Sequence, residues 1–146
     1  MPTLVPGDAR AVGDVMTPDP IVLKDTDTIR EAGLAMRRGD VGDVLVMHAS
    51  KIFGILTDRD IVVRTVAEGR DPNRAMLGEI CTRALVVVAP DDPIERAVDL
   101  MRRKAVRRLP VVLDDAPVGI VSLGDLAVRR DPDSALAAIS EAPGNL

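Results

Sequence analysis

The sequence repeats one eight-residue pattern, first as Gly54-Ile55-Leu56-Thr57-Asp58-Arg59-Asp60-Ile61 and again 65 residues later as Gly119-Ile120-Val121-Ser122-Leu123-Gly124-Asp125-Leu126. Both copies have glycine, two aliphatic residues, Thr or Ser, two variable residues, Asp and one more aliphatic residue. At the same offset, 15 of the 52 residues from Asp14 to Thr65 are identical to their counterparts. Such self-similarity indicates a duplicated structural unit. Because a unit of about 55 residues is marginally stable alone, we expect the two copies to pack into one globule.

Each copy predicts the same order of elements, β-α-β-β-α, so the fold class is mixed α/β with two pseudo-symmetric repeats. Apolar residues at helical spacing from Ile29 and from Ile94 predict the first helix of each copy. We expect Asp27 and Asp92 to cap these helices, with Pro93 at the first helical position. The expected strands are 21–23, 44–47, 52–56, 86–88, 109–113 and 118–121, and the expected second helices are 58–67 and 123–130.

The repeat also predicts where the domains begin and end. Gly69 suits the end of a helix, and Pro72 cannot continue one, so a linker is expected between the copies. The expected domains are 11–68 and 76–131, with a linker at 69–75 and a short helix (134–140) and tail within 132–146.

The composition excludes several classes of protein. Of 146 residues, 19 are Lys or Arg and 23 are Asp or Glu, and the formal net charge of −4 argues against general nucleic-acid binding. Trp and Tyr are absent and Phe occurs once, so the stacking platforms of most single-strand nucleic-acid binders are missing. One His and one Cys allow neither a multi-His metal site nor an intrachain disulfide. No apolar run approaches the roughly 18 residues of a membrane span, and no signal-peptide pattern is present, so we expect a cytoplasmic protein.

The hydroxyl and the carboxylate of the repeated pattern have two interpretations. Thr57 and Ser122 are good helix caps, and the Asp three positions later, Asp60 or Asp125, resembles the second half of a capping box. The same residues suit a ligand, because a helix N-terminus attracts phosphate and a carboxylate can accept both hydroxyls of a ribose. The pattern alone leaves both interpretations open.

The repeat resembles a tandem pair of CBS domains, often called a Bateman module. The resemblance covers roughly residues 11–130 and rests on DVMT at 14–17, VRRLPVV at 106–112 and the two repeated patterns. The stretch LTDRDIVVRTVAEGRDPNRA at 56–75 is also similar to stand-alone bacterial CBS pairs of the hypoxic-response type. The resemblance implies that the chain binds an adenosyl ligand: AMP, ADP or ATP, with S-adenosylmethionine or NAD as less favoured candidates.

Family roles imply that Asp60 and Asp125 hold the ribose, while Thr57 and Ser122 contact phosphate. In many CBS pairs each site is shared between the copies. One site would then join Thr57, Arg59 and Asp60 to Thr82, Leu85, Val86, Arg107 and Arg108. The other would join Ser122 and Asp125 to Thr17, Pro20, Ile21, Gly42 and Asp43. With three guanidiniums, the first site is expected to take the anionic nucleotide, because an acidic group in the second repels polyphosphate.

Several other residues have simpler expected roles. A predicted helix ends in the cations Arg102, Arg103 and Lys104. At this end they interact favourably with the helix dipole or could reach a ligand. His48 is expected at a strand end. Cys81 is expected to be a small packed residue without an activated thiolate. Met36 and Met101 occupy equivalent core positions.

The sequence therefore predicts a regulatory module that senses adenosine nucleotides, forms a homodimer and biases an unidentified partner protein. We expect no enzyme, because one His precludes a Ser-His-Asp arrangement and no GxxxxGK loop occurs. We also expect no required cofactor, no metal site, no nucleic-acid partner and no membrane partner. The alternative is a ligand-free dimer that binds a partner protein, with motifs that serve only as caps.

Overall fold

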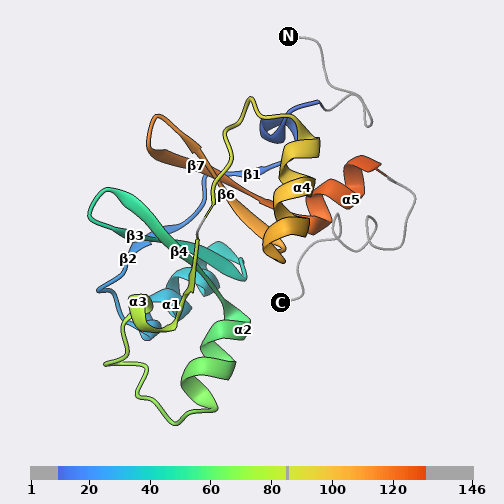
Figure 1. The fold of residues 1–146 in the computed structure, drawn as a ribbon. Helices are drawn as coiled ribbons and strands as arrows, with labels where there is room; N and C mark the ends of the chain where they lie inside the picture. The colour runs from blue at the N-terminus through green and yellow to red at the C-terminus, as the bar shows by residue number, and fades with distance from the viewer. Residues whose placement is uncertain (1–9, 85, 131–146) are drawn as a thin grey trace. The chain divides into compact units, whose positions relative to one another are not determined.

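The computed structural model describes residues 10–84 and 86–130. Within them the chain forms two compact units (Figure 1). Unit 1 combines residues 10–19 with residues 86–130, whereas unit 2 consists of residues 20–84. Each unit therefore contains a short segment from one copy of the repeat and the main part of the other. The domain boundaries inferred from the repeat stay a prediction, and the expected helix at 134–140 lies outside the described residues.

Unit 2 is built on a four-stranded sheet with the order β2-β3-β4-β5. β2 pairs parallel with β3, β3 and β4 form an antiparallel hairpin, and β5 pairs antiparallel with β4. The strands are β2 (Val22–Lys24), β3 (Asp43–His48), β4 (Lys51–Thr57) and β5 (Thr82–Arg83). The helices are α1 (Ile29–Gly39), α2 (Asp58–Ile61), the π-helix η2 (Val62–Val66) and α3 (Leu77–Ile80). Its core packs the buried faces of α1 and α3 against β3 and β4, and includes the buried Met36.

Unit 1 has the same plan with one strand fewer. Its three-stranded sheet has the order β1-β7-β6, and both pairings are antiparallel. The strands are β1 (Thr17–Pro18), β6 (Arg108–Leu113) and β7 (Ala116–Ser122). The helices are the 3₁₀ turn η1 (Val12–Asp14), α4 (Ile94–Lys104) and α5 (Leu123–Arg130). Met101 of α4 is buried in this core, at the position equivalent to Met36.

The two copies exchange their first short strands. Thr17 of β1 pairs with Ile120, and the equivalent Thr82 of β5 pairs with Ile55. Sequence analysis did not predict these two-residue strands. A glycine makes each approach possible: a Cβ at Gly54 would lie 2.4 Å from the Thr82 carbonyl oxygen, a separation that real Cβ atoms do not show.

The helix caps differ from the expected ones. Thr28, not Asp27, caps α1, because its Oγ1 accepts a hydrogen bond from Glu31 N at 3.3 Å. Asp27 instead accepts from the backbone of Lys24, three residues earlier. In the second copy Pro93 occupies the N-cap position itself, one residue before the helix begins. The expected Asp caps were wrong because these carboxylates close the turns that precede the helices.

Two further elements were predicted incorrectly. The expected strand 86–88 is reduced to one bridge between Val88 and Val111. In unit 2 the equivalent ladder includes a hydrogen bond from Leu45 N to Ile21 O at 2.9 Å, but Pro110 stands at the place of Leu45 and has no N–H to donate. The expected single helix at 58–67 is instead α2 followed by η2, in which Ala67 N donates to Val62 O, five residues back.

Candidate functional site

In unit 2, Thr57 ends β4 and begins α2, as the repeated pattern predicts. Thr57 Oγ1 accepts a hydrogen bond from Asp60 N at 3.1 Å, and Asp60 Oδ2 accepts one from Thr57 N at 3.0 Å. This reciprocal pair is a capping box, which satisfies two N–H groups that the helix leaves without partners. The box holds the Asp60 carboxylate at the end of the strand, where the residue is buried with 9% of its surface exposed.

Unit 1 repeats this arrangement where β7 meets α5. Ser122 N donates to Asp125 Oδ2 at 2.7 Å, and Asp125 N donates to Ser122 Oγ at 3.1 Å. Asp125 is half-buried, so it is more accessible than its counterpart in unit 2. The capping interpretation is therefore confirmed in both copies, while the ligand interpretation stays a prediction.

The carboxylate of Asp60 keeps capacity for another partner. Its Oδ2 is used by the capping box, whereas Oδ1 lies 3.9 Å from Arg64 Nε, the outer limit of an ion pair. Arg64 is held elsewhere, because its Nη1 donates to Ile80 O at 3.0 Å and to Cys81 O at 3.4 Å. A carboxylate oxygen accepts more than one hydrogen bond, so Asp60 Oδ1 can accept a hydroxyl or an N–H from a ligand.

Sequence reasoning missed Arg64 as part of this arrangement. The available signal was its spacing, since a position four residues after Asp60 lies on the same helical face. The same surroundings affect Cys81, which is buried as expected. Burial, and then the charge of Asp60, raise the pKa of the Cys81 thiol, which therefore stays protonated near neutrality.

The other residues predicted for the site divide between the two units. Unit 2 holds Arg59 beside Asp60, and the pair Asp43 and Thr57 face each other across the β3–β4 hairpin. Asp58 N donates to Gly42 O at 2.9 Å, so the start of α2 is tied to the start of β3. The remaining predicted residues in unit 2 are Pro20 and Ile21, which precede β2, and Thr82, which lies in β5.

Unit 1 brings the predicted arginines close to the serine motif of their own copy. Arg108 pairs with Ser122 across β6 and β7, and Leu123 N donates to Arg107 O at 2.9 Å. The other predicted residues in unit 1 are Val86, which packs on its core, and Thr17, which lies in β1. Leu85 lies outside the described residues. The expected sharing of each site between the copies stays a prediction.

His48 ends β3, as expected. Its Nδ1 lies 2.8 Å from Asp25 Oδ2, and its ring centroid lies 6.1 Å from that of Phe53. The guanidinium carbon of Arg83 lies over the Phe53 ring, 3.8 Å from its centroid. These contacts join the β3–β4 hairpin to β5 and to the loop after β2.

Each unit has one sheet that includes a short strand from the other copy, and in each unit the last strand of the hairpin leads into a helix capped by a hydroxyl–carboxylate pair. These features define a tandem repeat of one small α/β domain. The family model for the CBS domain matches residues 12–65 and 77–130. The chain therefore belongs to the CBS domain family and carries two CBS domains as a tandem pair. Such pairs are generally regulatory, ligand-binding modules.

Several known proteins are similar to this chain. The chain is 40% identical over 120 residues to the CBS domain-containing protein YhcV of Bacillus subtilis, covering 82% of this chain and 85% of that protein. It is 33% identical over 124 residues to Hypoxic response protein 1 of Mycobacterium tuberculosis, covering 84% and 86%. The crystal structure of Hypoxic Response Protein I with two coordinated zinc ions matches with a TM-score of 0.69 and 32% identity, covering 80% of this chain and 96% of that one. The resemblance predicted from the repeat is confirmed.

The described residues also bear on membranes and metals. None of their helices combines the length and the apolar character that a membrane span requires. Within the same residues, no three side chains of His, Cys, Asp or Glu gather where they could bind a metal ion.

Proposed function

We propose that this CBS pair is a regulatory module that binds an adenosine nucleotide, AMP, ADP or ATP, through the residues of its two repeated motifs. The observation that carries the proposal is the geometry of Asp60. The capping box fixes this buried carboxylate and occupies one oxygen, while the other oxygen has, among the described residues, only a distant ion-pair partner. A ribose diol supplies the hydroxyl donors that such an oxygen accepts.

Exposed cations near both motifs suit the phosphates of the ligand. Arg59 follows the threonine motif directly, and Arg107 is tied through its carbonyl to Leu123, the residue after Ser122. Both side chains are exposed, and no carboxylate among the described residues pairs with either guanidinium. A guanidinium that is not already paired can form charge-assisted hydrogen bonds to phosphate. S-adenosylmethionine and NAD remain less favoured ligands because they present fewer or differently placed negative charges.

The experiment is calorimetric titration of the full chain with AMP, ADP, ATP and S-adenosylmethionine. We expect saturable binding of an adenine nucleotide that is lost in Asp60→Ala, with Asp125→Ala tested in parallel. A thermal-shift assay accompanies it, since ligand at 100 times Kd adds about 2.7 kcal/mol to the free energy of unfolding. The scarcity of aromatic residues makes calorimetry preferable to intrinsic fluorescence.

The first copy offers a matched control for the loss of a capping box. Thr28 and Glu31 form the same reciprocal box at the start of α1, away from the motif. Glu31→Ala should therefore cost a similar amount of stability, about 1 kcal/mol, but leave nucleotide binding intact. Equal loss of binding in Glu31→Ala and Asp60→Ala would show that only stability had changed and would refute the assignment of Asp60.

The second candidate function is a ligand-free module that forms a homodimer and binds a partner protein. It is favoured by the exposed valines of η2, because exposed apolar clusters often mark interaction surfaces. Failure of every adenosyl ligand to bind, with an intact dimer in solution, would favour this function. The partner protein stays unidentified.

A further inference from the structure

Arg64 lies in the π-helix η2 and joins parts of unit 2 that are far apart in the sequence. Its Nη1 donates to Ile80 O at 3.0 Å and to Cys81 O at 3.4 Å, across 16 and 17 positions of the chain. Its Nε lies 3.9 Å from Asp60 Oδ1, the carboxylate oxygen that the capping box does not use. One guanidinium therefore stands between the motif carboxylate and the segment that leads into β5.

The two carbonyls belong to the end of a helix. α3 ends at Ile80, and the last carbonyls of a helix have no partner inside it. An arginine near such an end satisfies these carbonyls. Thr82 follows directly, and its pairing with Ile55 places β5 beside β4, the strand that leads to Thr57. The hydrogen bonds of Arg64 therefore hold the start of β5 to the helical side of the motif.

The buried carboxylate of Asp60 benefits from a nearby positive charge. Its side chain is 13% exposed, and burial of a carboxylate is costly unless an opposite charge and hydrogen bonds compensate. Arg64 supplies this charge from the next turn of the helical segment, with its own side chain 47% exposed. A separation of 3.9 Å is too long for a hydrogen bond, so Arg64 acts on Oδ1 without occupying it.

The local structure fixes the place of Arg64. The next residue, Thr65, is fully buried, whereas three valines of η2 are exposed. This buried side chain and the hydrogen bonds of Arg64 anchor η2 to the rest of the unit. π-Helical turns are rare and are frequent at functional sites. The second copy of the repeat has an arginine at the same position, Arg129.

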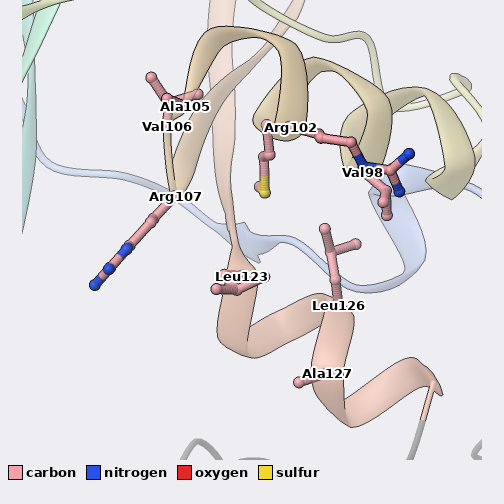
Figure 2. A pocket seen from close by; sticks show the side chains of 9 residues that line it. Val98, Arg102, Ala105, Val106, Arg107, Leu123, Leu126 and Ala127 are labelled. Carbon is pink, nitrogen blue, oxygen red and sulfur yellow. The ribbon is translucent and has the colours of Figure 1, made fainter.

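Arg64 differs from the arginines assigned to phosphate. Figure 2 shows that the side chain of Arg107 extends away from the other residues of the apolar pocket between α4 and α5, and this side chain is exposed. Such a guanidinium can turn toward a phosphate, whereas Nη1 of Arg64 is already engaged by two carbonyls. Arg64 is therefore suited to hold other residues in place.

We propose that Arg64 is a positioning residue of the nucleotide site, whose guanidinium holds the Asp60 carboxylate and the strand that carries Thr82 in the arrangement that accepts a ribose. This inference rests on the proposed function, in which Asp60 and Thr82 belong to one site. A guanidinium presents several N–H groups in a fixed planar fork, so it serves the carbonyls and the carboxylate together. A lysine ammonium has a single nitrogen and cannot do both.

Calorimetric titration of the full chain with AMP and with 2′-deoxyAMP separates positioning from stability. We expect the wild-type protein to prefer AMP, because 2′-deoxyAMP lacks one of the hydroxyl donors that Asp60 accepts. In Arg64→Gln the Kd for AMP should rise about tenfold, as when a charge-assisted hydrogen bond is weakened, and the preference over 2′-deoxyAMP should fall. A purely structural role would weaken the binding of both nucleotides by the same factor, and that result would overturn the inference.

Arg74→Gln is the matched control. Arg74 Nε lies 3.9 Å from Asp71 Oδ2, so the atoms and the distance resemble those of the Arg64 pair, but the side chain is 89% exposed and lies outside the motif. We expect its AMP affinity and its preference to equal those of the wild-type protein. Arg64→Lys keeps the charge and should fall between wild type and Arg64→Gln. If Arg64→Lys equals wild type in both measurements, charge alone suffices and the assigned geometry is wrong.

Hydrogen exchange without nucleotide distinguishes this inference from the proposed function. Arg64→Gln should speed amide exchange in residues 77–84 several-fold, while the β6–β7 hairpin of unit 1 keeps its rate and serves as the internal control. Unchanged exchange in residues 77–84 would refute the link between Arg64 and β5. A wild-type protein that binds no adenine nucleotide would refute the proposed function, and with it the role of Arg64 in a nucleotide site, whereas the exchange rates would still decide the link.

Discussion

Thr65→Val is expected to stabilise the protein, although it removes a polar group. Thr65 lies in η2 with 0% of its surface exposed, and among the described residues its Oγ1 has no hydrogen-bond partner. A buried hydroxyl without a partner costs about 1–3 kcal/mol. Valine has the same branched shape, so no cavity forms, and its additional methyl group contributes about 0.8 kcal/mol when buried. We therefore expect the free energy of unfolding to rise by about 1–3 kcal/mol. For a chain of this size, each kcal/mol raises Tm by about 3–4 °C.

Urea and thermal unfolding followed by circular dichroism would measure this change. Thr57→Val is the matched control, because the same substitution there removes a capping hydroxyl that is used, and should cost about 1 kcal/mol. Thr65→Ala should be less stable than Thr65→Val, since it leaves a small cavity. A Thr65→Val protein that is less stable than wild type would refute the reasoning, because it would show that the hydroxyl has a partner in solution.

Two further predictions concern the exchanged strands and the buried thiol. In urea unfolding, Gly54→Ala should destabilise the protein more than Gly119→Ala, within the range of about 1–3 kcal/mol for overpacking. The atom nearest to the new Cβ at Gly54 is the rigid backbone oxygen of Thr82, whereas at Gly119 it belongs to the flexible side chain of Met16. Equal losses would contradict this reasoning. Cys81 should react with a thiol reagent much more slowly in the folded than in the unfolded chain near neutral pH, because burial and then Asp60 raise its pKa. Because the pKa of Cys81 is higher in the folded than in the unfolded chain, the protonated thiol favours the folded state. This contribution to stability is complete below the pKa of the unfolded chain and is lost as the pH rises through the pKa of the folded chain. A reaction rate unchanged by folding would count against the raised pKa.

Local patterns in the sequence were sufficient for most of the regular elements. The apolar runs around the turns at 49–50 and 114–115 predicted both hairpins, because alternating side chains and a short turn act over neighbouring residues. The spacing of Thr57 and Asp60 predicted a capping box for the same reason, since both partners lie within one helical turn. Pro110 limited the strand expected at 86–88, because a proline affects a hydrogen bond to a distant segment that the local pattern does not include.

The sequence by itself determined that the chain is a duplicated β-α-β-β-α unit of the CBS type, with the motif residues at the ends of its last strands. Only the tertiary structure decided which segments complete each sheet. β1 and β5 contain two residues each, so they show no periodicity, and their pairing with β7 and β4 depends on glycines that permit close backbone approach. The structure also decided which side chains of the second helical segment stay exposed, as Val62, Val63 and Val66 of η2 do, because packing and helix geometry determine this and the local pattern does not.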